Sequence, residues 1–200
     1  MASRSDDRGM VLIVVLVTIT LLAALGAAMT LATTTEVAIA ANYREATETL
    51  YAAEAGVAFV MQEVAAIADW TGVATGSGQS AFVDGSPTGM RAVGSAVFDL
   101  ADATNKLNAV APAAPGAVPP WVLHAFGPLQ DLVPASAGRA PVYVAVWIAN
   151  HALSADESMQ GALSILGQAY GPRGSRRGVE VIVEKAGVSE VRRRAWRESP

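Results

Sequence analysis

The sequence predicts an α+β protein in which one long N-terminal helix packs on a small C-terminal antiparallel β-sheet. Residues 10–69 contain no proline and only two glycines, so a single helix can run through the whole stretch. The last 60 residues form β-rich runs bounded by Gly, Pro, Asn or Ser, and their short connections favour antiparallel pairing. A length of 200 residues suits one membrane segment and one modest globular core.

The first half of the predicted helix, residues 10–35, is apolar enough to cross a membrane. Residues 9–35 carry no charge, and about 20 apolar residues are enough to cross a bilayer as a helix. Arg4 and Arg8 precede this run, whereas the next basic residue is Arg44, so the bias of basic residues places the N-terminus in the cytoplasm. Two alternatives stay open at this point: a signal peptide cut near residues 25–29, and a plain membrane anchor.

The second half of the helix, residues 36–70, carries an amphipathic pattern. Eight residues follow one another at alternating steps of four and three, which places them on one helical face. They are Tyr43, Thr47, Leu50, Glu54, Val57, Met61, Val64 and Ala68. We expect this stripe to lie on the globular part that follows residue 70, which we call the head. Glu54 is then near the edge of the buried face or paired with a residue of the head, such as a C-terminal arginine, and the alternative is a contact with another subunit.

Residues 71–141 are the least regular part of the sequence. Residues 71–96 are rich in Gly and Ser and predict a loop, and the apolar spacing of residues 97–110 predicts a short helix. Seven prolines within residues 111–141 exclude a long helix or a central strand there. Four β-rich runs then predict an antiparallel sheet over residues 142–200. The runs are residues 142–150, 161–171, 178–186 and 190–196.

The cysteine and histidine content argues against an enzyme or a metal centre. The absence of cysteine excludes disulfides, thiolate zinc sites and cysteine nucleophiles, and two histidines leave little material for histidine catalysis. No phosphate-binding or hydrolase motif is present, so we expect neither catalysis nor a cofactor. Asn150, Asp156 and Glu157 offer oxygen ligands of the type that calcium prefers, but they lack the spacing of a calcium loop, which favours a solvated hairpin loop.

Charge is distributed unevenly along the chain. Residues 173–200 hold eight basic against four acidic residues, whereas residues 36–69 hold one basic against six acidic residues. We expect attraction between a basic sheet and an acidic helix, within one subunit or between neighbours. The alternative is DNA binding by the basic last strand, against which the net charge of −4 argues. The candidate residues for this surface are Arg192, Arg193, Arg194 and Arg197.

The N-terminal residues resemble a known family. The polar stretch MASRSDDRG, followed by an uncharged helix that continues as an amphipathic one, is similar to the precursors of type IV pilins and pseudopilins. The resemblance implies that residues 1–9 are a leader, which prepilin peptidase removes by cutting between Gly9 and Met10 on the cytoplasmic side. It further implies N-methylation of Met10 and retention of the helix for assembly.

A second segment resembles the PilX-like minor pilins in particular. Residues 42–64, NYREATETLYAAEAGVAFVMQEV, carry the asparagine, the arginine and the AAEAG block found in the helix of these proteins. The runs RRGVEVIVEK and VRRRAWRES resemble their closing strands. The matching positions in the helix are Asn42, Arg44, Ala52, Ala53, Glu54, Ala55 and Gly56.

One position departs from the pattern of major pilins. These carry glutamate at the fifth residue after the cut, where it pairs with the N-terminal amine of a neighbouring subunit, and here this position is Val14. A carboxylate buried in lipid is costly unless it is paired, so its absence removes both the cost and the docking signal. The departure fits a minor pilin, or the tip pseudopilin of type II secretion, better than a repeating shaft subunit.

The resemblance implies a structural subunit in an initiating or tip complex of a type IV pilus or a related filament. The chain would pass once through the inner membrane, with its head in the periplasm, before it enters a cell-surface pilus or a periplasmic pseudopilus. Its implied partners are other major and minor pilins, prepilin peptidase, the inner-membrane assembly platform and membrane lipid. The alternatives are a pilin-like DNA-binding or adhesive surface protein, and a periplasmic hydrolase or binding domain on a simple anchor or signal peptide.

Overall fold

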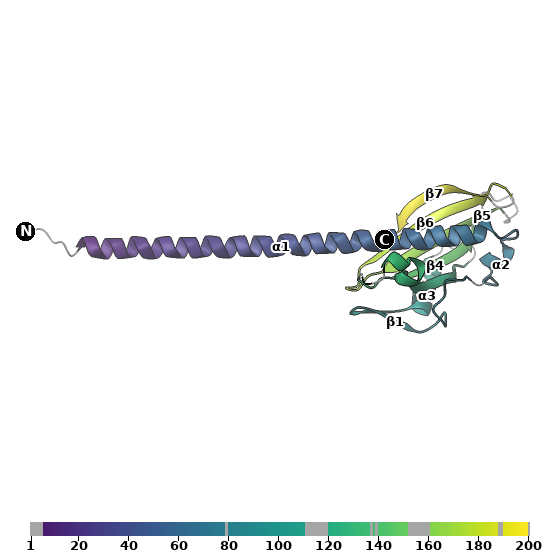
Figure 1. Ribbon diagram of the computed structural model, residues 1–200, viewed down its shortest axis with the longest axis horizontal. Helices are drawn as coiled ribbons and strands as arrows, with labels where there is room; N and C mark the ends of the chain where they lie inside the picture. Colours follow the sequence, from purple (N-terminus) through teal and green to yellow (C-terminus); the bar gives the residue numbers. More distant parts are fainter. Residues whose placement is uncertain are drawn as a thin grey trace, which may run out of the picture. The chain divides into compact units, whose positions relative to one another are not determined.

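The computed structural model of the chain describes most of the sequence (Figure 1). It divides into two units, Met1–Arg44 and Glu45–Pro200. Helix α1, Asp6–Ala65, begins in the first unit and ends in the second. The described residues are 6–78, 80–110, 120–136, 138, 140–151, 161–187 and 190–199.

The described part of the first unit is helical and has an exposed apolar surface. Residues 9–40 are exposed throughout, and α1 is the one helix in the described residues that is long and apolar enough to cross a membrane. Its threonine hydroxyls donate to main-chain carbonyls of the same helix: the Thr18 Oγ1 lies 2.8 Å from the Val14 oxygen, and the Thr30 Oγ1 lies 2.9 Å from the Gly26 oxygen. These bonds satisfy the hydroxyls without water, as a lipid environment requires.

The second unit is built on a five-stranded antiparallel sheet, which confirms the predicted α+β class (Figure 1). Strands that follow one another in sequence are neighbours in the sheet, and each of the four predicted runs corresponds to one of the last four strands. The strands are β3 (Val122–Pro128), β4 (Tyr143–Asn150), β5 (Ala162–Tyr170), β6 (Arg176–Lys185) and β7 (Val191–Ser199).

The middle of the chain has more regular structure than the sequence predicts. Residues 71–96 are not only loop, because they contain α2 (Thr71–Ala74), β1 (Met90–Val93) and the first residue of β2 (Ala96–Asp99). The short helix predicted over residues 97–110 is wrong at its beginning, since α3 spans Leu100–Val110 and residues 97–99 belong to β2. The remaining short helices are α4 (Leu129–Leu132) and a 3₁₀ turn (Pro134–Ser136).

Local residues explain where the β1–β2 hairpin turns and where α3 begins. Gly94 adopts a positive φ of 59°, which a two-residue turn between antiparallel strands requires, and Val93 pairs with Ala96 across it. The Asp99 Oδ1 accepts from the Asp102 N at 2.8 Å and so caps the first turn of α3. The strand that the described part of the proline-rich stretch adds to the sheet is β3, an edge strand, in agreement with the exclusion of a central strand.

The sheet is covered on both faces, and β4 shows this most clearly. Val144, Val146 and Ile148 belong to the core cluster that includes α1 residues, whereas Tyr143 and Trp147 belong to a second cluster with the hairpin and α3. Alternate residues of one strand therefore enter two cores, as the pleat of a strand requires. The Trp147 Nε1 donates to the Thr104 Oγ1 of α3 at 2.8 Å, which satisfies its only donor.

The predicted helix stripe is rotated with respect to the face that is buried. Of the eight stripe residues, only Val57 and Val64 are fully buried, Tyr43 is 74% exposed, and Ala68 lies beyond the helix end at Ala65. The larger apolar side chains of the stripe flank the contact, because the sheet lies against smaller residues. The buried helix residues are Glu45, Thr49, Ala52, Ala53, Gly56, Val57, Val60 and Val64.

Candidate assembly interface

Small residues allow α1 to lie close to the centre of the sheet. Gly56 faces β4, and a Cβ atom at this position would lie 2.5 Å from the Val144 Cγ1. Gly167 of β5 faces the helix in the same way, because a Cβ atom there would lie 2.6 Å from the Val57 Cγ2 and 2.7 Å from the Ala53 oxygen. Close-packed interiors do not admit such overlaps, so this helix-to-sheet distance depends on glycine at both positions.

Glu45 joins the beginning of this contact to the turn between β5 and β6. Its carboxylate accepts from the Arg173 Nε at 2.6 Å and from the Ser175 Oγ at 2.9 Å, and its side chain is 10% exposed. Thr49, one helical turn further on, lies with its Oγ1 3.1 Å from the Ser175 Oγ. Burial raises the pKa of Glu45, but the hydrogen bonds from Ser175 and Arg173 outweigh burial and hold the pKa below its usual value.

The other end of the contact is fixed by Lys185 of β6. The Trp70 Nε1 donates to the Val64 oxygen at 2.9 Å and so folds the chain back at the end of α1. The Lys185 Nζ donates to the Ala68 oxygen and lies 5.9 Å from the centroid of the Trp70 ring. Ala68 follows the end of α1 at Ala65, so the ammonium group binds the chain just beyond the helix. Polar contacts therefore hold α1 at both ends of its contact with the sheet.

Glu63, also on α1, holds the segment that covers the β3 edge of the sheet. Its two carboxylate oxygens accept from the Ser80 Oγ at 2.7 Å and from the Ala81 N at 2.8 Å. The His124 Nε2 lies 3.4 Å from the Glu63 Oε2 without making a hydrogen bond, and the His124 side chain is 3% exposed. Burial lowers the pKa of His124, and this effect outweighs the opposite effect of Glu63, so His124 is neutral at pH 7.

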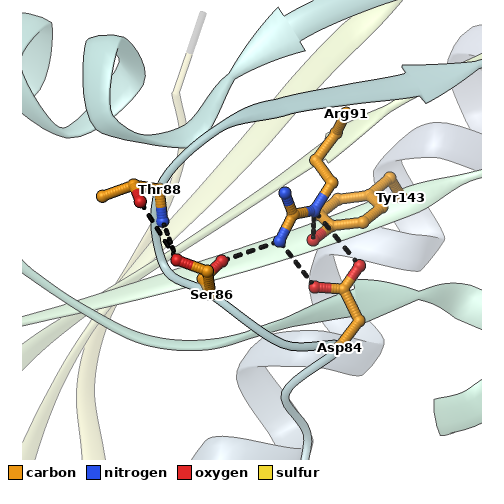
Figure 2. A network of polar contacts seen from close by, with 5 residues as sticks. All are labelled: Asp84, Ser86, Thr88, Arg91 and Tyr143. Atoms are coloured by element: carbon orange, nitrogen blue, oxygen red, sulfur yellow. Dashed lines mark hydrogen bonds and ion pairs between the residues drawn. The ribbon is translucent and has the colours of Figure 1, made fainter.

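Figure 2 shows how Arg91 of β1 joins the loop before the hairpin to the beginning of β4. Its Nη2 donates to the Asp84 Oδ1 at 3.0 Å and to the Ser86 oxygen at 2.7 Å, and its Nε donates to the Tyr143 hydroxyl at 3.1 Å. The hydrogen bond to Asp84 raises the pKa of Arg91, whereas burial raises the pKa of Tyr143. The guanidinium hydrogen-bonds to three residues, Asp84, Ser86 and Tyr143, and so fixes the loop against the sheet.

A cavity of about 630 Å³ lies beside α1, between β1 and the connection from β3 to β4. The Arg91 network forms one side of it through Tyr143, and the floor includes Ala52 and Ala55 of the helix. On this side the helix surface stays accessible, and Tyr51 is 64% exposed. The second unit therefore leaves a mainly apolar groove along the same stretch of α1 that carries the small residues.

The arginines of β7 pair with glutamates of the neighbouring strand. Arg192 and Arg194 both bind the Glu184 carboxylate, and the Arg197 Nε lies 2.9 Å from the Glu180 Oε2. The register places Arg192 opposite Glu184 and Arg197 opposite Glu180. Hydrogen bonding from Arg192 lowers the pKa of Glu184. Three of the four residues proposed as a DNA-binding surface thus form ion pairs with carboxylates of β6.

Among the described residues, Glu54 does not pair with a C-terminal arginine, and it lies at the edge of the buried helix face. Glu54 is half-buried on α1 and forms no ion pair with a described residue. The C-terminal arginines are held by β6 through the strand register, and the rotated helix face brings Glu45 and Glu63 to the head instead. A contact between Glu54 and another subunit stays a prediction.

The remaining predicted positions of the helix lie in the first unit. Gly9, Met10, Val14, Asn42 and Arg44 are all exposed on α1, with Met10 at 66% and Val14 at 58%. A Cβ atom at Gly9 would meet no atom within 4 Å. These residues are therefore on the surface of a helix, where an enzyme or another subunit has access to them.

The weak calcium candidate falls mostly outside the described residues. Asn150 ends β4, whereas Asp156 and Glu157 lie outside the described ranges. Within the described ranges no group of three or more His, Cys, Asp or Glu side chains is placed to hold a metal ion.

The comparisons with known proteins concern the helix. Residues 8–58 match the family model described as PilX N-terminal, and no curated protein or solved structure matches the chain significantly. The matched segment contains the exposed apolar run and the small residues that lie against the sheet. Together with the helix-and-sheet fold, the match supports a type IV pilin-like protein. It is consistent with a minor pilin of the PilX-like kind, and the apolar helix fits a membrane-anchored chain.

Proposed function

We propose that this chain is a minor pilin or pseudopilin, a structural subunit that enters a type IV pilus or a related filament through α1. The observation that carries the proposal is the surface of residues 9–40, which is apolar over most of its length and exposed on every side. Such a helix needs lipid around it, or other helices of the same kind. The family match over residues 8–58 supports packing against other such helices as well as a position in lipid.

Processing by prepilin peptidase is part of the proposal. Gly9 and Met10 are exposed on α1, so the bond between them is accessible from the side of the helix. Removal of residues 1–9 leaves Met10 as the first residue, with Val14 in the fifth position. A subunit without a carboxylate there does not offer the charge that docks a shaft pilin, which favours a minor component at the initiating or tip complex.

The proposal places the first unit in the inner membrane and the second unit in the periplasm before assembly. The neighbours are other major and minor pilins, and prepilin peptidase and the assembly platform act on the chain earlier. On the second unit, the accessible side of α1 at Tyr51 and the adjoining groove provide a surface for such neighbours. A structural role of this kind uses packing surfaces and needs no catalytic group.

A pair of matched variants tests whether the chain assembles through the apolar helix. Leu16 and Val97 are 63% and 59% exposed, in the first and second unit respectively, and each is replaced by aspartate in the cells that produce the protein. Membrane and sheared filament fractions are then probed with an antibody against the chain. We expect the unchanged chain and Val97→Asp in the filament fraction, in amounts far below those of the major pilin.

Leu16→Asp tests the helix because a carboxylate there is costly among apolar helices unless it is paired. We expect it to be lost from the filament fraction while part of it stays in the membrane fraction. The proposal is contradicted if the unchanged chain is confined to the membrane and the number of filaments does not change when the chain is deleted.

A further inference from the structure

The two edges of the sheet differ in how they are covered. Along β3, the segment before the hairpin adds a parallel bridge at Val83, with the Phe126 N donating to the Phe82 oxygen at 2.8 Å and the Asp84 N donating to the Phe126 oxygen at 3.1 Å. Along β7, the described residues provide no partner beyond β6, and Figure 1 shows β7 as the outermost strand. In the described part of the chain, the outward main-chain donors and acceptors of the nine-residue β7 thus have no strand partner.

The side chains of β7 are also more accessible than those of the other strands. Seven consecutive residues, 192–198, are exposed. Trp196 stands opposite Val181, which is 1% exposed, and so shares the core face of the sheet, yet its own side chain is 44% exposed. The core face of the sheet therefore continues onto β7, where the Trp196 side chain is only partly buried.

Charge defines which strand can pair with this edge. Strands β6 and β7 together hold seven basic against three acidic residues. Arg193 stands opposite Val183 and makes no ion pair with a described residue, unlike the three arginines that β6 binds. Two copies of β7 would bring net positive strands together, which is unfavourable. A strand that carries carboxylates meets complementary charge.

We infer that β7 is a binding edge for an extended acidic segment of another protein, which adds a strand to the sheet beside Arg193 and Trp196. Main-chain hydrogen bonds supply the affinity of such strand addition, and side chains at alternate positions supply the specificity. The net positive charge that discourages pairing between copies, with Arg193 outside the ion pairs of β6, selects an acidic partner. The inference goes beyond the proposed function, because it concerns the head and requires neither processing of α1 nor assembly.

The test uses the full chain in detergent micelles and three peptides of nine residues, the length of β7. The first alternates glutamate and valine, the second has lysine in place of glutamate, and the third is the first with alternate amides N-methylated. We expect only the first peptide to bind strongly, because the second has the wrong charge and the third cannot form the main-chain ladder. Hydrogen exchange should then slow in β7 and not in β3.

Two protein variants distinguish peptide binding at β7 from non-specific electrostatic attraction to the protein. Arg193→Glu should weaken binding of the acidic peptide about tenfold, since it replaces a favourable cross-strand charge with an unfavourable one. Lys106→Glu makes the same change on α3, where the Lys106 side chain is 73% exposed, and should alter binding less than about twofold.

Four outcomes of the peptide experiments would overturn the inference. They are equal binding of the N-methylated peptide, equal binding of the lysine peptide, unchanged binding to Arg193→Glu, and slowed exchange in the groove beside α1 instead of in β7. Association of two copies through β7, or Arg193-dependent binding of duplex DNA without binding of the acidic peptide, would assign the edge to a different partner and would equally reject it.

Discussion

Glu45 and Arg173 form an ion pair although 128 positions separate them in the sequence, with the Arg173 Nε 2.6 Å from the Glu45 Oε2. The pair lies where α1 enters the second unit, and it connects the helix to the turn between β5 and β6. The glycine contacts at Gly56 and Gly167 and the Lys185 contact continue the same attachment along the helix. A subunit that assembles through α1 must transmit load from helix to sheet through this contact.

The first prediction concerns the ion pair itself. Glu45→Gln should lower the free energy of unfolding of the second unit by about 1–3 kcal/mol at pH 7, because it removes the charged hydrogen bonds that Ser175 and Arg173 make to a mostly buried carboxylate. Chemical denaturation followed by near-UV circular dichroism of the full chain in detergent measures this change. Glu54→Gln, on the same helix and without an ion pair to a described residue, is the matched control and should change the value by less than about 0.5 kcal/mol.

The difference between the wild type and Glu45→Gln should depend on pH. The folded pKa of Glu45 lies below its ordinary value of 4.5, so the contribution of the carboxylate to stability is complete above pH 4.5 and is lost as the pH falls through the folded pKa. The two unfolding free energies should therefore converge as the pH is lowered from 6 toward 3. A difference that stays constant over this range would show that folding does not lower the pKa of the Glu45 carboxylate.

The second prediction concerns the close approach of α1 to the sheet. Gly167→Ala would place a Cβ atom 2.7 Å from the Ala53 oxygen, a main-chain atom that cannot move alone, and should cost about 1–3 kcal/mol of unfolding free energy. Gly161→Ala, at a position with nothing within 4 Å, is the control and should be neutral or slightly stabilising. Equal melting temperatures for the two variants would mean that the helix lies further from β5.

The third prediction concerns the buried His124. Its pKa is lowered from the ordinary value of 6.5 by burial, so the unfolded chain takes up a proton before the folded chain does. Stability is then complete above pH 6.5 and decreases as the pH falls through this value toward the lower folded pKa. His124→Phe should reduce the loss of unfolding free energy between pH 7.5 and 5.5, because phenylalanine takes up no proton. The same pH dependence in the wild type and in His124→Phe would contradict the buried neutral state.

The fourth prediction concerns the Arg91 network. Arg91→Lys keeps the charge but cannot make the three bonds to Asp84, Ser86 and Tyr143 together, and should destabilise the second unit by about 1–2 kcal/mol. Lys106→Gln removes an exposed ion pair on α3 and should cost less than about 0.5 kcal/mol. Thermal unfolding of both variants decides this, and an Arg91→Lys melting temperature equal to that of the wild type would show that the network contributes nothing.

The helix and the last four strands could be predicted from the sequence because their signals are local and continuous. The absence of proline and the uncharged run over residues 9–35 mark α1, and alternating valines mark β6. The beginning of α3 could also have been found, since Asp99 is a capping residue three positions before Asp102. The β1–β2 hairpin was missed because its strands have only four residues each and its Gly94 turn lies within a stretch rich in Gly and Ser.

The buried helix face and its ion pairs could not be predicted from hydrophobic spacing. The spacing favoured large residues such as Leu50 and Met61, whereas the close contact selects alanine and glycine, which carry little apolar signal. Glu45 and Glu63 find their partners through chain reversals of 17 to 130 residues, and no local pattern encodes these. The AAEAG block, noted for its resemblance to a family, proved informative for a physical reason, because it supplies Gly56.

The mass and N-terminal sequence of the mature protein test the central claim most directly. We expect the chain isolated from its own cells to begin at an N-methylated Met10, without residues 1–9. Gly9→Val should block this cut, whereas Gly26→Val should not, although a Cβ atom meets nothing within 4 Å at either position. A mature chain that begins near residue 29, or one that keeps Met1 or Ala2, would contradict a pilin-type subunit and would indicate a signal peptide or a plain anchor instead.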